Sequence, residues 1–125
     1  MLLDSNIIIY GAMPEHAEIR YFIARYHPAV SVVSYVEVLG YHKLTHQERL
    51  HFEAFFTVAP MLGLSQAVLD QAVRLRQIRK MTLGDALVAG TALAHDLTLV
   101  TRNTSDFDWI SDLSLLDPFL ASVDQ

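Results

Sequence analysis

Four acidic residues stand at points where this sequence is expected to begin or end a regular element. Asp4 follows the apolar run at the start of the chain, and Asp85 opens an apolar segment typical of a buried helix. Glu37 falls about one turn into the helix expected after the second strand, and Asp106 follows a later strand and its turn. Carboxylates placed in this way can converge at one edge of a parallel sheet, although no local spacing forces them to do so.

Each acid also has a structural explanation that requires no chemistry. Asp4 fits the N-cap of the first expected helix. Ser34 and Glu37 match the capping-box pattern, which by itself is the simpler interpretation of Glu37. Asp85 suits the first turn of a helix because the helix dipole favours negative charge there, and Asp106 suits a turn. Taken one at a time, the four residues therefore indicate caps and turns.

Taken together, the four acids favour a cation site. Carboxylates gathered at one sheet edge repel one another unless a cation holds them. Sites built only from oxygen ligands suit magnesium or manganese better than zinc. One or two such ions can activate water and stabilise the leaving oxygen of a phosphodiester. A hydrolytic metal site is therefore the chemistry that this set of residues would support.

The elements that must position these acids alternate between short β-rich runs and helical runs. Helical spacing of apolar residues and the positions of Pro, Gly and capping residues define them. We expect strands at residues 1–3, 30–33, 97–100 and 113–116, with a strand or loop at 57–64. We expect helices at residues 7–12, 15–26, 34–44, 45–56, 65–80 and 83–95. Such alternation predicts an α/β fold with a parallel sheet covered on both faces.

Composition limits the classes of function that remain. The chain has 125 residues, 52% of them hydrophobic, which fits a single domain over residues 1–125 with a filled core. The absence of cysteine excludes disulfides, zinc–thiolate sites and thiol nucleophiles, and it agrees with a cytoplasmic location. We expect neither a signal peptide nor a membrane span, because the charge pattern and the apolar run lengths fit neither.

Charge gives a mixed indication about nucleic acids. A net charge of −5 argues against nonspecific binding, which usually leaves a basic footprint. Four of the nine basic residues nevertheless fall within residues 74–80. Arg76, Arg79 and Lys80 have i, i+3, i+4 spacing and are expected to share one helix face. That face could grip RNA phosphates, or its charges could simply complement the C-terminal helix dipole, and the sequence leaves both open.

Four fragments of the sequence, in order, resemble the acidic motifs of PIN-domain ribonucleases. They are Leu3-Asp4-Ser5-Asn6, the segment 33–39 around Glu37, Asp85-Ala86-Leu87-Val88-Ala89, and the segment 99–107 around Asp106. Any one fragment is a weak signal, but four in the right order over most of the chain are specific. In its compact length and in the residues of its motifs, the chain is most similar to the VapC toxins of this family.

The resemblance carries several expectations about structure and function. It implies a three-layer α/β/α sandwich with a central parallel sheet, and RNA cleavage that depends on Mg²⁺ or Mn²⁺. It implies that the four acids are the catalytic and metal-binding residues, and that a cognate antitoxin inhibits the site. Homodimers are common among such proteins.

Smaller polar residues beside the acids have two interpretations each. Ser5 and Asn6 would help to orient a metal-bound carboxylate or water in the family, whereas a helix cap is the alternative for Asn6. Thr101 and Asn103 could hydrogen-bond Asp106 or a bound water, whereas ordinary turn chemistry is their alternative. The sequence does not decide between these roles.

Two other functions compete with a ribonuclease toxin. A small magnesium phosphohydrolase would also place aspartates at strand ends, but no Asp-x-Asp motif follows the first strand. A noncatalytic PIN scaffold that binds RNA or protein has no need for a full set of four clustered acids, which would be costly to keep without a metal. A small DNA-binding antitoxin reading frame beside the gene would favour the toxin.

Overall fold

A parallel sheet forms the centre of the computed structural model, which describes residues 1–121. Within those residues the sheet has five strands in the order β3-β2-β1-β4-β5, all parallel. The strands are β1 (Leu2–Leu3), β2 (Ala29–Ser31), β3 (Met61–Leu62), β4 (Leu99–Val100) and β5 (Leu115–Leu116). The first strand of the chain lies in the middle, where Leu2 stands opposite both Ala29 of β2 and Leu99 of β4.

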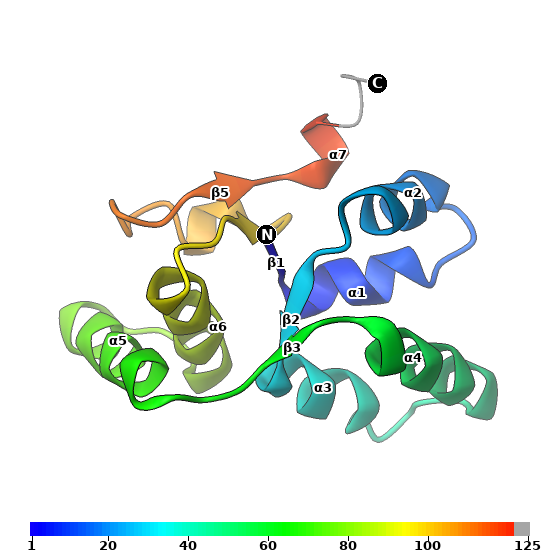
Figure 1. Ribbon diagram of the computed structural model, residues 1–125, viewed down its shortest axis with the longest axis horizontal. Helices are drawn as coiled ribbons and strands as arrows, with labels where there is room; N and C mark the ends of the chain where they lie inside the picture. Colours follow the sequence, from blue (N-terminus) through cyan, green and yellow to red (C-terminus); the bar gives the residue numbers. More distant parts are fainter. Residues whose placement is uncertain (122–125) are drawn as a thin grey trace.

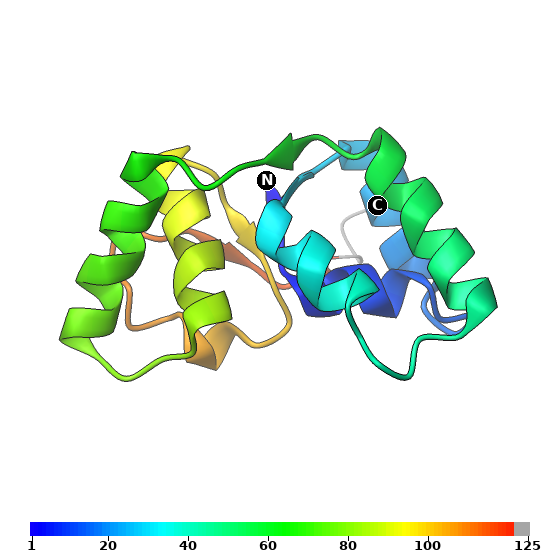
Figure 2. The same ribbon diagram turned by 90° about the horizontal axis from the view of Figure 1, so that it is seen from below.

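Helices cover both faces of this sheet, as the sequence predicted (Figure 1). They are α1 (Ser5–Gly11), α2 (Ala17–Tyr26), α3 (Val32–Leu39), α4 (His46–Val58), α5 (Gln66–Ile78), α6 (Leu83–Ala94) and α7 (Pro118–Ala121), with a 3₁₀ turn η1 (Thr104–Asp106). The helices α1 to α4 gather on one side, and α5 and α6 pack together on the other (Figures 1 and 2). The expected three-layer α/β/α architecture is therefore confirmed.

Two hydrophobic clusters, one on each face, hold the layers together. Successive side chains of a strand point to opposite faces. Leu3 accordingly packs with Ile7 and Phe22 beneath α1 and α2, whereas its neighbour Leu2 packs with Val88 of α6 on the other side. Both leucines are fully buried. A two-residue strand thus anchors the two halves of the core and fixes the position of Asp4, the next residue.

The helix α6 is buried almost all round, as its continuous apolar sequence predicted. Its contact with α5 depends on Gly90. A Cβ atom built on Gly90 would lie 2.9 Å from the carbonyl oxygen of Val68 and 3.1 Å from the amide nitrogen of Ala72. Because these neighbours are backbone atoms of α5, they cannot rotate out of the way. The lack of a side chain at Gly90 therefore permits the close approach of the two helices.

Several helix boundaries differ from the expectation, and two of the differences bear on the candidate site residues. The helix expected at residues 34–44 is α3, which begins at Val32 and ends at Leu39. The side chain of Ser31, at the end of β2, caps it by accepting a hydrogen bond from Val33 N. The capping box predicted at Ser34 and Glu37 is therefore wrong, because the strand passes directly into the helix three residues earlier than the pattern indicated. Both side chains are left free for another role.

The second difference concerns α5, which ends at Ile78 rather than at Lys80. Arg79 has an extended backbone, with φ −153° and ψ 149°, so it lies outside the helix. The expectation that Arg76, Arg79 and Lys80 share one helix face is therefore wrong. The chain must leave the helix at this point because Thr82, only three residues further on, already caps α6.

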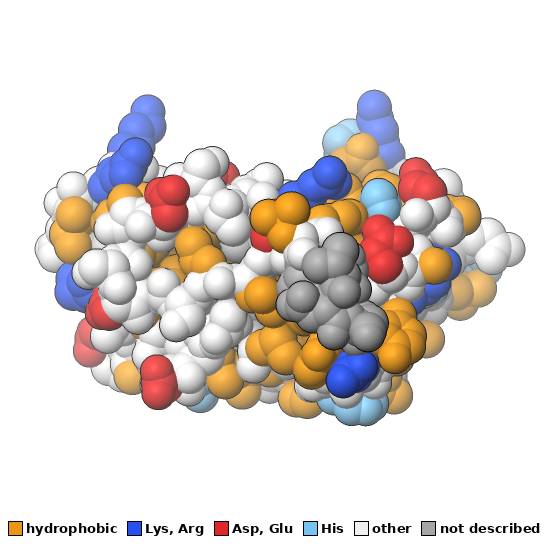
Figure 3. Space-filling view, turned by 90° about the horizontal axis from the view of Figure 1, so that it is seen from above, with side chains coloured by type: hydrophobic (Ala, Val, Ile, Leu, Met, Phe, Trp, Pro, Cys, Tyr) orange, Lys and Arg blue, Asp and Glu red, His pale blue; other side chains and the backbone are white. Residues whose placement is uncertain are grey.

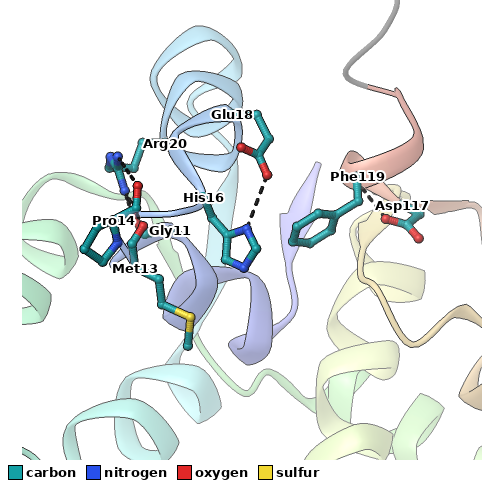
Figure 4. A network of polar contacts seen from close by, with 8 residues as sticks. All are labelled: Gly11, Met13, Pro14, His16, Glu18, Arg20, Asp117 and Phe119. Carbon is teal, nitrogen blue, oxygen red and sulfur yellow. Dashed lines mark hydrogen bonds and ion pairs between the residues drawn. The ribbon is translucent and has the colours of Figure 1, made fainter.

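The helix α7 was not expected, although Asp117 and Pro118 are typical of a helix start. Asp117 accepts a hydrogen bond from Phe119 N (Figure 4). The Phe119 ring packs edge-on against Tyr10 and His16, with ring centroids 5.4 and 5.2 Å away. The guanidinium of Arg102, which directly follows Thr101, lies 4.2 Å from the centroid of the Phe119 ring. These contacts join α7 to the end of α1 and to the loop after β4.

Two surface properties bear on possible partners. Among residues 1–121, no helix is both long and apolar enough to cross a membrane. On the face that carries α7, the visible Lys and Arg side chains stand at separate points and do not form a continuous basic patch (Figure 3).

Candidate active site

The four predicted acids line one pocket beyond the carboxyl ends of the parallel strands. This is the edge at which open α/β sheets bind ligands. The pocket has a volume of about 320 Å³. Its lining consists of Asp4, Ser5, Asn6, Ile9, Glu37, Thr82, Asp85, Asn103, Asp106 and Phe107. The prediction that the four carboxylates converge is confirmed, as is the placement of Ser5, Asn6 and Asn103 beside them.

Asp4 is the buried acid of the pocket, with 7% of its surface exposed. One carboxylate oxygen accepts a hydrogen bond from Ser5 N at 2.8 Å, so the predicted helix cap is present. The other oxygen accepts a hydrogen bond from the Thr101 hydroxyl at 2.8 Å. Burial raises the pKa of Asp4, and the nearby charges of Asp85 and Glu37 raise it further, whereas the two hydrogen bonds oppose the increase. Asp4 therefore caps a helix and belongs to the acidic pocket at once.

A chain of hydroxyl groups holds Glu37 against α1. The Ser5 hydroxyl lies 2.7 Å from Glu37 Oε1 and 2.8 Å from the hydroxyl of the buried Ser34. A carboxylate can only accept, so Ser5 donates its single proton to Glu37 and Ser34 donates to Ser5. Glu37 and Asp4 are thus both bonded to the same residue, Ser5, through its side chain and its backbone.

The other oxygen of Glu37 lies over the first turn of α6. A Cβ atom built on Gly84 would stand 2.7 Å from Glu37 Oε2, closer than real Cβ contacts allow. The next residue, Asp85, donates its backbone N–H to the hydroxyl of Thr82, which caps α6. Burial raises the pKa of Asp85, and the charges of Asp106 and Glu37 add to this, whereas the Thr82 hydroxyl lowers it. The predicted helix-start role of Asp85 is therefore also present.

Asp106 reaches the pocket from the exposed turn η1. The backbone of this turn is held at two points: Asp106 N donates to Asn103 O, and the Trp109 indole N–H donates to Asp106 O, each at 3.0 Å. The guanidinium of Arg79 lies 5.4 Å from the centre of the Trp109 ring. For Thr101 the sequence left open a bond to Asp106 or water and an ordinary turn contact. The turn contact is present, since the Thr101 hydroxyl accepts from Asn103 N at 3.0 Å, and the hydroxyl donates to Asp4 and not to Asp106.

The chemistry of this pocket fits a hard divalent cation. Its charged ligands are all carboxylates, and serine, threonine and asparagine oxygens stand beside them. Burial, and to a smaller extent the neighbouring carboxylates, raise the pKa values of Asp4 and Asp85, and a cation would favour the charged form of both. Within residues 1–121, no three acidic or histidine side chains already form a closed metal cage.

Comparison with protein-family models matches residues 1–112 to the PIN domain. The chain belongs to the PIN domain family. The resemblance that rested on four acidic fragments is thus confirmed, and all four fragments fall within the matched region. Comparison with curated proteins finds no match.

Solved structures show the same PIN fold. A chain of a toxin–antitoxin complex from Klebsiella pneumoniae is 28% identical, with a TM-score of 0.75 over 94% of this chain and 96% of that one. A chain of VapBC2 from Rickettsia felis, bound to a promoter DNA fragment, is 21% identical, with a TM-score of 0.80 and 92% and 96% covered. A chain of DNA-bound VapBC from Salmonella typhimurium is 18% identical, with a TM-score of 0.82 and 94% and 96% covered.

Three residues that position the acids of this PIN domain were missed in the sequence. Ser34 was assigned to a helix cap, although it is the buried partner of Ser5. Thr82 stands three residues before Asp85, a spacing typical of an N-cap and therefore available in the sequence. Gly84 gave no signal, because its importance depends on a carboxylate that is 47 positions away in the chain and adjacent only in the folded protein.

Proposed function

We propose that this chain is a VapC-type toxin, an endoribonuclease that depends on Mg²⁺ or Mn²⁺. The observation that carries the proposal is the single pocket lined by Asp4, Glu37, Asp85 and Asp106 at the ligand-binding edge of the sheet. Membership of the PIN family and the 28% identity to a chain of the Klebsiella pneumoniae toxin–antitoxin complex add support.

The four carboxylates would hold the ion, which when bound would supply Lewis-acid chemistry and ease the ionisation of water. Ser5 and Thr101 fix the orientation of Glu37 and Asp4, so that these oxygens need little reorganisation. Asn6 and Asn103 line the pocket and carry amide N–H groups that can donate to phosphate oxygens. Water would attack the phosphorus, and the bond to the leaving ribose oxygen would break.

The basic residues before α6 are proposed to bind the RNA backbone, although not as one helix face. Arg76 and Lys80 line a shared depression with Met81. Met81 directly precedes Thr82, which lines the acidic pocket. Arg79 instead contacts Trp109, whose indole holds the turn of Asp106. Replacing Arg76 and Lys80 with Gln should weaken RNA binding and flatten its salt dependence, since fewer counterions are released. An unchanged salt slope would assign both residues to a structural role.

The proposed partner in the cytoplasm is a cognate antitoxin. An apolar depression of about 370 Å³ lies between α1, α2 and α4, and Ile8, Ile23 and Phe55 contribute to it, with Arg20 and His51 among its polar residues. A groove of this kind suits the apolar face of a helix. Large apolar side chains are also exposed elsewhere, including Val36, Val58, Ile78 and Leu83, and a second copy in a homodimer would cover surface of this type.

The decisive experiment measures cleavage of end-labelled RNA by purified protein after removal of metal with EDTA. Cleavage should be absent, and Mg²⁺ or Mn²⁺ should restore it in the wild type but not in Asp85→Asn. Cleavage that is unaffected by EDTA would remove the metal mechanism, and RNA binding without cleavage under any metal would indicate a noncatalytic scaffold.

Expression in a bacterial host tests the toxin role separately. Induction of the wild type should arrest growth, Asp4→Asn should not, and co-expression of the adjacent reading frame should restore growth. Normal growth with soluble, active enzyme would retain the nuclease and exclude the toxin. Sedimentation of the purified chain measures whether it is a homodimer.

A further inference from the structure

Gly84 lies in the first turn of α6 and has no side chain. The carboxylate of Glu37, one of the four acids, occupies the space that a side chain there would need. The helices α3 and α6 are in contact, and the side chain of Glu37 on α3 lies beside Gly84 on α6. Its Oε2 occupies the space that a side chain at position 84 would need, 2.7 Å from the ideal Cβ position, and its Cδ lies 3.4 Å from that point.

A hydrogen bond to one oxygen holds the carboxylate of Glu37 in this position. Oε1 accepts the Ser5 hydroxyl at 2.7 Å, and Ser5 is itself bonded to the buried Ser34. A methyl group on residue 84 would displace Oε2, and the long, exposed Glu37 side chain could respond by rotating away from α6. That rotation would break the bond from Ser5, because both oxygens belong to one rigid group. The position of Glu37 therefore depends on residue 84 having no side chain.

We propose that Gly84 is a positioning residue for the proposed metal site. Glu37 Oε2 occupies the space that a side chain at residue 84 would fill, and this position keeps the Glu37 carboxylate beside Asp4 and Asp85 as a ligand. The expected effect on metal binding rests on the proposed function, whereas the contact between Gly84 and Glu37 does not. Gly84 touches neither ion nor RNA in this role, and it acts entirely through Glu37.

A contrast among glycines makes the effect specific. Gly63 has no atom within 4 Å of its ideal Cβ position, so Gly63→Ala makes the same chemical change in open space. Alanine is at least as favourable as glycine in a helix, so Gly84→Ala should fold and keep a melting temperature equal to or above that of the wild type. A loss of metal affinity in Gly84→Ala therefore cannot be attributed to loss of fold.

The test combines calorimetric titration with Mn²⁺ and a crystal structure. Residues that orient metal ligands typically change metal affinity by about 10–100-fold. Gly84→Ala should weaken Mn²⁺ binding by at least about tenfold, and Gly63→Ala should not change it. Added to Glu37→Ala, Gly84→Ala should cause no further loss, because the side chain through which it acts is gone. The Gly84→Ala crystal structure should show the hydrogen bond between Ser5 and Glu37 broken.

Two results would overturn the inference. One is a further loss of affinity in the double variant, which would mean that residue 84 acts through Asp85 or the helix start. The other is a Gly84→Ala structure in which Glu37 keeps its bond to Ser5. If the wild type itself binds neither Mn²⁺ nor Mg²⁺, the proposed function fails, and the crystal structure alone still decides whether Gly84 seats Glu37.

Discussion

The acidic pocket has two halves that are held in different ways. The fixed half consists of Asp4 and Glu37, whose carboxylate oxygens are bonded to Ser5 and Thr101. The open half consists of Asp85 and Asp106, at a helix start and on an exposed turn, where mainly the backbone is held. The fold therefore fixes two of the four carboxylates by hydrogen bonds and leaves the other two less constrained. If the proposed cation binds, we expect the open half to make the larger adjustment.

The largest expected effect concerns one acid from each half. Asp4→Asn and Asp85→Asn should each lower RNA cleavage by more than about 100-fold, beyond the range of residues that only orient ligands. The shapes are nearly unchanged, so circular dichroism should show the wild-type fold in both variants. Residual cleavage near the wild-type rate in either variant would mean that this half does not contribute to catalysis.

A smaller effect is expected from loosening the fixed half. Thr101→Val removes the hydroxyl that donates to Asp4 and preserves the buried shape, so cleavage and Mn²⁺ affinity should fall by about 10–100-fold. The nearby exposed Ser105 supplies the control, since Ser105→Ala should leave both quantities unchanged. If the two variants behaved alike, preorganisation of Asp4 by Thr101 would be refuted.

The open half should be more tolerant at its exposed member. Asp106→Asn should reduce cleavage by about tenfold, the low end of the range for indirect ligands, because this side chain can reach the ion through water. Mn²⁺ titration and steady-state cleavage measure the effect. A loss as large as that of Asp85→Asn would make Asp106 a direct ligand and would remove the proposed difference within the open half.

The smallest effect is on stability, and its sign follows from the raised pKa of Asp4. The folded, metal-free protein binds this proton more tightly than the unfolded chain, whose ordinary carboxyl pKa is 3.8. The stabilising contribution is present below that value and is lost as pH rises through the higher folded pKa. In EDTA, the free energy of unfolding of Asp4→Asn should therefore increase relative to that of the wild type as pH rises from 3.8 through the higher folded pKa of Asp4. Urea unfolding at several pH values measures it, and excess Mn²⁺ should reverse it.

The features predicted correctly from the sequence rest on local patterns. Alternating strands and helices indicated the parallel sheet, and the continuous apolar run at residues 83–95 indicated that α6 is buried. The acids were found because residues after parallel strands share one edge of the sheet. The helix ends were predicted less well, since the capping pattern at Ser34 and the basic run at Arg79 do not reveal where the chain must turn.

The contacts that orient the acids could not be predicted from local patterns. The partners of Ser5 lie 29 and 32 positions away, and the hydrogen bond from Thr101 to Asp4 spans 97 positions. Such pairs depend on strand register, which a sequence pattern fixes only to within a residue or two. For this reason the sequence offered only nearby partners for Thr101, among them Asp106 but not Asp4, and it gave no indication of the contact between Gly84 and Glu37.

The central place of β1 has a consequence for the order in which the acidic pocket is assembled during synthesis. Asp4 is synthesised 97 residues before its hydroxyl partner Thr101, and likewise well before its strand partner β4. At about 5–20 residues per second, a ribosome needs several seconds to make the intervening segment. Until then the middle of the sheet lacks one neighbour, and the acidic pocket lacks Asp85 for most of that interval. A nascent chain that has not yet reached Thr101 therefore carries an incomplete acidic pocket, in which Asp4 lacks its hydroxyl partner.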